Sequence, residues 1–287
     1  MNKRALYLWI AAWFGFAVAA QGQTVPLHFG TTNGVLDEFG QPLQGTDVGA
    51  PSFGFPYVTG EVVQILDANA GVFPPSTDGT PDTNNAVIFE TRVGAGADPA
   101  LGPAGLFGGS VQRPSGQIIA RVFNRSALSA ASFYADSPVF VVPTTNYDVF
   151  IPDVARTDTP LDPSDSDGDG LHNSWEKSLG SNANNPDTDG DGMADGPEFR
   201  AGTGVTNENS FLAMVQLIPA GNNDLSVVWD SVAGKQYLIE YTPDDLKNNP
   251  VYTNVTDVLS ATGSVTSATI TNGMLSEGGH YRVRLAD

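Results

Sequence analysis

Asp165-Ser-Asp167-Gly-Asp169-Gly170-Leu171-His172-Asn173-Ser-Trp-Glu176 is the most informative stretch of this chain. The same pattern returns twenty-two residues later as Asp187-Thr-Asp189-Gly-Asp191-Gly192-Met193-Ala-Asp195-Gly-Pro-Glu198. Both copies fit D-x-D-x-D-G-x5-E, the spacing of a twelve-residue calcium loop. The alternating aspartates can turn their carboxylates toward one centre, and the glycine at position six allows the sharp bend that returns the chain.

The expected ligands follow from the preference of calcium for six to eight oxygen atoms at about 2.3–2.6 Å. Carboxylates, the main-chain carbonyl of position seven and a water-mediated contact at position nine supply them. The first set is Asp165, Asp167, Asp169, Leu171 (main chain), Asn173 and Glu176. The second set is Asp187, Asp189, Asp191, Met193 (main chain), Asp195 and Glu198. The sequence therefore predicts two Ca²⁺ sites.

An acidic, solvated linker is the alternative explanation, because Asp and Gly also concentrate in disordered loops. A linker, however, has no reason to place Gly and Glu correctly twice at a constant offset. Between Asp153 and Glu198 the chain carries twelve acids against Arg156 and Lys177, a net charge of −10. Two carboxylates about 4 Å apart repel by about 1 kcal/mol in water and about 4 kcal/mol at an effective dielectric constant near 20. We therefore expect the loops to stay open without a cation.

The N-terminus has the pattern of a secretory signal peptide. Lys3 and Arg4 precede an apolar stretch from Ala5 to Ala20, and small residues come before polar Gln21. This predicts a signal peptide over residues 1–20, with cleavage near Ala20. An uncleaved membrane anchor is the alternative, but the run is short for a span. No later stretch is apolar enough to cross a bilayer, so we expect a secreted protein, extracellular or at the cell surface, without a transmembrane anchor.

The charge and the cysteine content narrow the class of protein. The formal net charge is −19, and loss of Lys3 and Arg4 would make it −21. Such a chain repels nucleic acid and anionic membranes, so we expect neither as a partner. The chain has no cysteine. A secreted protein without disulfides needs other cross-links, and bound metal ions are one substitute.

Two β-rich segments are expected. In residues 24–152, short apolar or alternating runs are separated by turn residues at 61–66, 86–93, 117–123 and 139–142, and the stretch around 133–134 could hold a helical turn. In residues 206–287, candidate strands cover 211–218, 224–230, 236–242, 251–259, 264–271 and 279–285. The predicted fold class is mainly β, with two β-sandwich domains joined by a duplicated EF-hand-like loop and helix segment at residues 153–205.

The predicted connector has three parts. Residues 153–164 look like a solvated linker. A short helix should follow each calcium loop, over 174–179 and 197–201, because Gly180 and Gly202 are natural helix stops. Trp175, Leu179 and Phe199 are then expected to pack the two repeats together.

The acidic segment resembles a known family of repeats. The segment 165–198 resembles the thrombospondin type 3 calcium repeats of secreted bacterial proteins. The phrases that are similar to the repeat unit of that family are Asp-Ser-Asp-Gly-Asp-Gly-Leu, Asn-Pro-Asp-Thr-Asp-Gly-Asp-Gly-Met and Pro-Glu-Phe-Arg-Ala-Gly-Thr. The resemblance implies acidic side chains that wrap calcium and shape a rigid connector. Residues 206–287 resemble the fibronectin type III sandwich that often follows such repeats.

Dockerin is the closest rival, since it also duplicates a calcium loop with an exit helix. A dockerin would imply a cohesin partner and an assembly role. Dockerins usually repeat a similar pair of residues at positions ten and eleven, whereas this chain has Ser174-Trp175 and Gly196-Pro197.

Catalytic motifs are hard to find. The histidines are His28, His172 and His280, each expected at a structural or surface position, with the ring of His172 facing outward. No zinc site and no G-x-S-x-G elbow is expected. Glu61 and Glu90 are the carboxylates to examine for glycoside cleavage. We expect no enzyme.

The function expected from the sequence is that of a secreted calcium-binding surface or matrix protein in which two ions rigidify the linker between β domains. Its expected partners are calcium ions together with cell-surface or matrix components or polysaccharide. The alternatives are a polysaccharide-binding or degrading protein and a dockerin-like assembly module.

Overall fold

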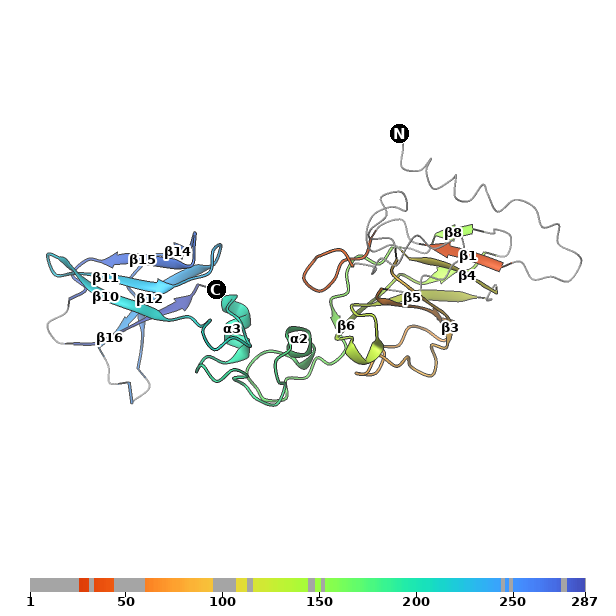
Figure 1. The fold of residues 1–287 in the computed structure, drawn as a ribbon, viewed down its shortest axis with the longest axis horizontal. Coiled ribbons are helices and arrows are strands. Elements are labelled where there is room, and N and C mark those ends of the chain that lie inside the picture. The colour runs from red at the N-terminus through yellow and green to blue at the C-terminus, as the bar shows by residue number, and fades with distance from the viewer. Residues whose placement is uncertain are drawn as a thin grey trace, which may run out of the picture. The chain divides into compact units, whose positions relative to one another are not determined.

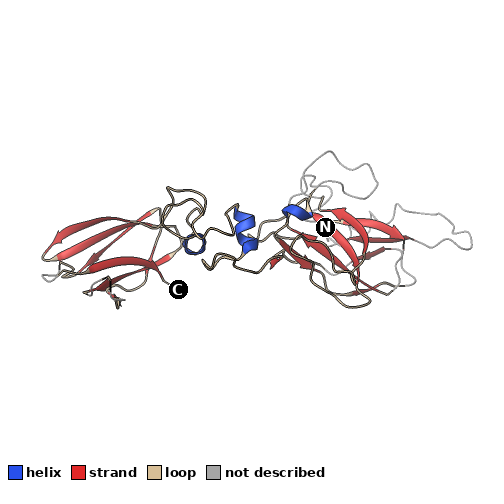
Figure 2. Ribbon diagram, turned by 90° about the horizontal axis from the view of Figure 1, so that it is seen from below, coloured by secondary structure: helices blue, strands red, loops and turns tan. Residues whose placement is uncertain are grey.

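The computed structural model describes residues 26–30, 34–43, 60–94, 107–112, 116–143, 148–150, 153–243, 246–247, 250–274 and 278–286. The predicted signal peptide, residues 1–20, lies outside the described residues. The chain divides into two compact units, Met1–Pro163 and Ser164–Asp287. Strands predominate in both units, and the helices are short (Figure 2). The predicted fold class is thus confirmed as mainly β, with sheets before and after a short helical segment, while the four-part domain division stays a prediction.

The described residues of the first unit form two sheets (Figure 1). The six-stranded sheet has the order β3-β2-β5-β6-β9, with β7 paired to β5. Its strands are β2 (Val62–Asp67), β3 (Val87–Arg92), β5 (Gln117–Phe123), β6 (Phe133–Asp136), β7 (Phe140–Val141) and β9 (Thr159–Pro160). In the three-stranded sheet, β1 (Pro26–Gly30) lies between β4 (Gly108–Gln112), which is antiparallel to it, and β8 (Asp148–Phe150), which is parallel.

The core of this unit lies on both faces of β2 and β5. Val63 and Ile65 point into the larger apolar cluster, whereas Val62 packs in a second cluster. Burial on both faces explains why these strands have nearly continuous apolar sequences. The fully buried Arg121 completes the second face by donating hydrogen bonds of 2.6 and 2.7 Å to the carboxylate of Asp136.

Two local expectations differ from the structure. Residues 133–134 belong to strand β6, and a short 3₁₀ helix, η1 (Leu128–Ala130), precedes it. Residues 153–163 are integrated into the first unit, so they are not a solvated linker. Val154 and Leu161 are 2 % and 5 % exposed, and β9 pairs with β6. The physical reason is that burial of these apolar side chains is favourable, whereas a solvated linker would leave them exposed to water.

The second unit contains a β-sandwich built from two further sheets. One has the order β10-β11-β15; in the other, β12 lies between β16 on one edge and the short strands β13 and β14 on the other. The strands are β10 (Met214–Gly221), β11 (Asp224–Asp230), β12 (Gln236–Thr242), β13 (Thr253–Asn254), β14 (Leu259–Ser260), β15 (Val265–Ile270) and β16 (His280–Leu285). The expected strand at 251–259 therefore breaks into β13 and β14.

The alternation of buried and half-buried residues along β11 defines the core of the second unit. Leu225, Val227 and Trp229 are buried between the sheets, and their neighbours in the strand are half-buried. Trp229 meets Tyr237 of β12 edge-on, with ring centroids 6.0 Å apart. Among the described residues, no helix has the length and apolar character needed to cross a bilayer.

Candidate metal centre

The first acidic loop is folded around its own aspartates. Asp165 accepts hydrogen bonds from the backbone N–H groups of Gly168 (2.8 Å) and Gly170 (3.0 Å) through its two carboxylate oxygens. Asp169 accepts one from the N–H of Leu171 at 2.7 Å. These bonds hold the carboxylates of the loop in place, since each spans only two to five residues.

The second loop repeats this network. Asp187 accepts from the N–H groups of Gly190 (2.8 Å) and Gly192 (3.0 Å), and Asp191 accepts from Met193 at 2.8 Å. The two loops therefore have the same local geometry, as their sequence repeat predicts.

Glycine is required at two positions of each loop. Gly170 and Gly192, at position six, have φ of +89° and +98°, in the left-handed region that only glycine adopts without strain. Gly168 and Gly190, at position four, also have positive φ, of +81° and +79°. The calcium-loop pattern predicts glycine only at position six. The D-G-D-G phrase was the available signal for position four.

In each loop, three aspartates converge. One carboxylate oxygen from each of Asp165, Asp167 and Asp169 lies within 4.8 Å of the others, and the same holds for the second set. That second set is Asp187, Asp189 and Asp191. The main-chain oxygens of Leu171 and Met193 follow directly in the chain, and their role as ligands stays a prediction.

A short helix carries the last carboxylate of each loop. Helix α2 (Asn173–Leu179) starts after His172, whose Nδ1 accepts a hydrogen bond of 3.2 Å from the N–H of Trp175. His172 is therefore the N-terminal cap of the helix and is half-buried, and the outward direction of its ring stays a prediction. Helix α3 (Asp195–Ala201) starts two residues earlier than predicted. Both helices end at a glycine in the left-handed conformation, Gly180 and Gly202, as predicted.

The glutamates at position twelve are the strongest evidence for a ligand. Glu176 is fully buried, and neither of its carboxylate oxygens has a hydrogen-bond partner. Glu198 is also fully buried; its Oε1 accepts a bond of 3.0 Å from Thr203, whereas its Oε2 has no partner. Buried carboxylates normally have hydrogen-bond or ionic partners, because their desolvation is expensive. These two side chains thus require a cation or a proton.

The electrostatics of the glutamates point the same way. Burial, followed by the nearby charges of Asp167 and Asp169, raises the pKa of Glu176 to about 7. Burial likewise raises the pKa of Glu198 to about 7, against a lowering by the hydrogen bond from Thr203 and with a further increase from Asp191. The negative charges of each loop are therefore concentrated around its buried glutamate, a setting that favours a bound metal ion.

The side chain at position nine of each loop accepts hydrogen bonds from the residue at position two of the same loop. Asn173 accepts a hydrogen bond from the N–H of Ser166 at 3.2 Å. Asp195 accepts from both the N–H (2.8 Å) and the hydroxyl (2.7 Å) of Thr188. Each side chain closes its loop across the start of the helix, and a contact with calcium, which the sequence suggested through water, stays a prediction.

The two repeats contact each other. The N–H of Gly196, in the first turn of α3, donates a hydrogen bond of 2.7 Å to Asp169 of the first loop. A Cβ atom on Gly196 would lie 2.5 Å from the backbone oxygen of Asp169, so only glycine allows this approach. Trp175 and Phe199 pack with ring centroids 4.7 Å apart, as expected. No sequence pattern signalled the contact at Gly196.

The donor set fits a hard divalent cation. The converging atoms are all oxygens, and several of those buried without a partner belong to the predicted ligands, namely Asp167 Oδ2, Glu176 Oε1 and Oε2, Asp189 Oδ2, Asp191 Oδ2 and Glu198 Oε2. Carboxylate oxygens of this kind suit calcium, whereas zinc sites usually include histidine or cysteine.

Comparison with known families supports this reading. The family model described as Bacterial TSP3 repeat matches residues 165–186 and 187–203. Residues 165–203 are two bacterial TSP3 repeats. TSP3 repeats are calcium-binding repeats, and the matched segments contain all the candidate ligands. No curated protein and no solved structure matches the chain. The resemblance of residues 206–287 to fibronectin type III stays a prediction.

Proposed function

We propose that the two TSP3 repeats bind one calcium ion each, and that calcium binding and folding of this segment are coupled. The observation that carries the proposal is the pair of buried glutamates, Glu176 and Glu198, whose carboxylates have three oxygens without partners. The equivalence of the two loops supports a count of two ions, since both present three converging aspartates and one buried glutamate.

The proposed role of calcium is to make an acidic segment rigid. Extracellular modules commonly bind calcium with a Kd of about 10⁻⁴–10⁻³ M. At a hundred times Kd, one site stabilises the folded state by about 2.7 kcal/mol. This is a substantial fraction of the free energy of unfolding of a whole domain, which is about 5–15 kcal/mol. Calcium would therefore convert a self-repelling chain into a fixed spacer between β domains.

We place this protein outside the cell, as a non-catalytic surface or matrix protein. The predicted signal peptide over residues 1–20 supports export, and the repeat family is of an extracellular type. Its proposed partners besides calcium are components of the cell surface or matrix, including polysaccharide. N-terminal sequencing of the exported protein tests the location, and a start at residue 21 is expected.

Isothermal titration calorimetry of the full chain tests the metal proposal. We expect a stoichiometry of about two calcium ions and a Kd of about 10⁻⁴–10⁻³ M. Glu176→Gln should leave about one ion bound in this range, because it removes one charged ligand from one loop. Glu208→Gln changes an exposed glutamate outside the loops and is the matched control. Absence of binding at millimolar calcium would refute the proposal.

A further inference from the structure

The sandwich of the second unit has edges that differ in how they are protected. Natural sheets guard exposed edges with proline, bulges or charged side chains. Strand β10 has Pro219 and two register irregularities along its pairing with β11. Strand β16 presents Arg282 and Arg284, both bonded to Glu240. These two edges are therefore poor templates for another strand.

Strand β15 lacks every one of these devices. It pairs with β11 over six successive residues without a register shift, and no other strand in the described part of the chain pairs with its second edge. Residues 258–275 contain no charged residue and no proline. A regular, uncharged edge rich in β-branched residues favours pairing with an added strand.

The free hydrogen-bonding groups of β15 follow from its register. Ser231 donates its N–H to the carbonyl of Ser264 at 2.8 Å. Since hydrogen-bonded and non-hydrogen-bonded pairs alternate in an antiparallel ladder, the N–H and C=O groups of Val265, Ser267 and Thr269 point toward the second edge. Three donors and three acceptors are thus available in one row.

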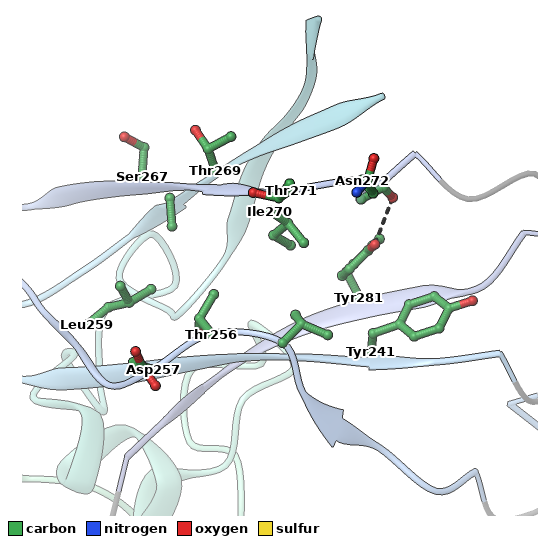
Figure 3. A pocket seen from close by; sticks show the side chains of 13 residues that line it. Tyr241, Thr256, Asp257, Leu259, Ser267, Thr269, Ile270, Thr271, Asn272 and Tyr281 are labelled. Carbon is green, nitrogen blue, oxygen red and sulfur yellow. Dashed lines mark hydrogen bonds between the residues drawn. The ribbon is translucent and has the colours of Figure 1, made fainter. Parts of the chain in front are cut away.

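A cleft of about 860 Å³ lies next to this edge (Figure 3). Ala268 and Ile270 line it from β15, and Val255, which follows β13, and Leu259 of β14 line it from the other side. In Figure 3, Ile270 points into the gap, whereas Ser267 and Thr269 point away from it. All four apolar residues belong to the sandwich core or pack against it. The cleft therefore exposes the side of the core directly beneath the row of free backbone groups.

One end of the cleft is closed by tyrosine. The hydroxyl of Tyr281 donates a hydrogen bond of 2.7 Å to the carbonyl of Gly273, which fixes the ring across the end of the gap (Figure 3). Tyr241 packs against it with ring centroids 5.1 Å apart. An added strand therefore has one defined end, at this pair of rings.

We propose that the free edge of β15 and this cleft bind an extended peptide segment of a partner protein by strand addition. Six residues of an added strand span about 20 Å, and alternate side chains point to one face. About three apolar side chains would enter the cleft while the backbone pairs with Val265, Ser267 and Thr269. This mode of recognition takes affinity from backbone hydrogen bonds and specificity from the side-chain pocket.

The charge of the site defines the partner further. Asp257 is the one charged residue among those lining the cleft, and it is exposed. The segment that binds should therefore be uncharged along its inward face and carry a lysine or arginine near Asp257. A second copy of this chain fits less well, because each copy has a net charge of −19 and would bring its own Asp257.

Amide hydrogen exchange of the full, calcium-loaded chain, followed by NMR, tests the proposal. The probe is a capped peptide of about eight residues, alternating valine and threonine with lysine at both ends. Bound peptide should slow exchange at Val265, Ser267 and Thr269 by at least about tenfold, whereas the amide of Ala268, already paired with β11, should keep its rate. A peptide N-methylated at alternate residues cannot pair and is the control.

Two variants make the test specific. Ser267→Pro removes a donor that points away from β11, so the sandwich should fold while peptide affinity falls by at least about tenfold. Ser267→Ala keeps the donor and should bind like the unaltered chain. Asp257→Asn should reduce the preference for lysine-bearing peptides.

Three outcomes would overturn the proposal. The first is unchanged exchange at Val265, Ser267 and Thr269 with saturating peptide, and the second is equal binding by the N-methylated peptide. The third is self-association of the chain without peptide that Ser267→Pro abolishes, which would assign the edge to a second copy. None of these results bears on calcium binding, so the proposal stands or falls independently of the repeats.

Discussion

Two buried glutamates in the second unit have opposite surroundings. Glu240 lies on β12 and accepts hydrogen bonds of 2.7 Å from Arg282 and from Arg284, one through each carboxylate oxygen. Glu176 lies on α2 with neither oxygen partnered. Both are nearly inaccessible, with 6 % and 0 % exposure. The β-sandwich thus neutralises its buried charge with its own arginines, whereas the repeat leaves the charge for a ligand.

The pKa values express the same contrast. Burial acts to raise the pKa of Glu240, but the hydrogen bonds from Arg284 and Arg282 outweigh it and bring the pKa below the usual 4.5. Burial and neighbouring aspartates raise the pKa of Glu176 to about 7. A protein that supplies its own counter-charge is stable without calcium. Where the protein supplies no counter-charge, folding of the segment depends on the cations in solution. A structural segment of this kind can therefore respond to calcium.

Removal of calcium should produce the largest difference in stability between the repeats and the β-sheets. Two sites at a hundred times Kd contribute about 5 kcal/mol together, so a chelator should unfold residues 164–203 while the sheets of the first unit persist. Hydrogen exchange with mass spectrometry should show fast exchange over α2 and α3 and slow exchange over β2 and β5. Equal protection of the repeats with and without calcium would break the contrast.

Gly196→Ala should be the most damaging small substitution. The new Cβ would lie 2.5 Å from the backbone oxygen of Asp169, so the repeats must separate, at a cost of about 2–3 kcal/mol. Thermal unfolding of the calcium-loaded chain measures the loss. Gly263→Ala is the matched control, because nothing lies within 4 Å of its Cβ position and its φ is ordinary. An unchanged melting temperature for Gly196→Ala would contradict the observed contact.

Neutralising each glutamate should have opposite effects. Glu240→Gln should destabilise the sandwich by about 1–2 kcal/mol, a modest value because its arginines are partly exposed, and leave calcium affinity unchanged. Glu176→Gln should weaken calcium binding in the first loop by at least about tenfold and spare or stabilise the calcium-free protein. Denaturant titrations with and without calcium measure both. Similar behaviour of the two variants would remove the distinction.

The smallest expected effect is a loss of sandwich stability at acidic pH. Because the pKa of Glu240 in the folded chain is below 4.5, its contribution to stability is present above that value and is lost as the pH falls through the folded pKa. Calorimetric scans between about pH 3 and about pH 6 should show the sandwich transition falling in temperature below about pH 4.5. Glu240→Gln should show a shallower decline, and an identical pH profile would mean that other carboxylates control it.

Much of the sandwich and of the metal centre was predictable from local signals. Strands β11 and β12 have the predicted bounds, and the predicted alternation of Leu225, Val227 and Trp229 along β11 matches its burial pattern. The two clusters of converging aspartates follow from loop spacing alone. The packing of the predicted linker was not predictable from local signals. The pairing of β9 with β6 and the burial of Leu161 depend on a strand that is distant in sequence.

The amino-acid sequence by itself determined the two acidic loops, their helices and the β class, because these rest on spacing, glycine placement and alternation within short windows. Only the tertiary structure decided which charges are buried without partners, that Gly196 contacts Asp169, and that β15 presents a regular, uncharged edge beside a cleft. These properties depend on residues that are far apart in the chain. Burial and hydrogen bonding between them arise only once the chain has folded.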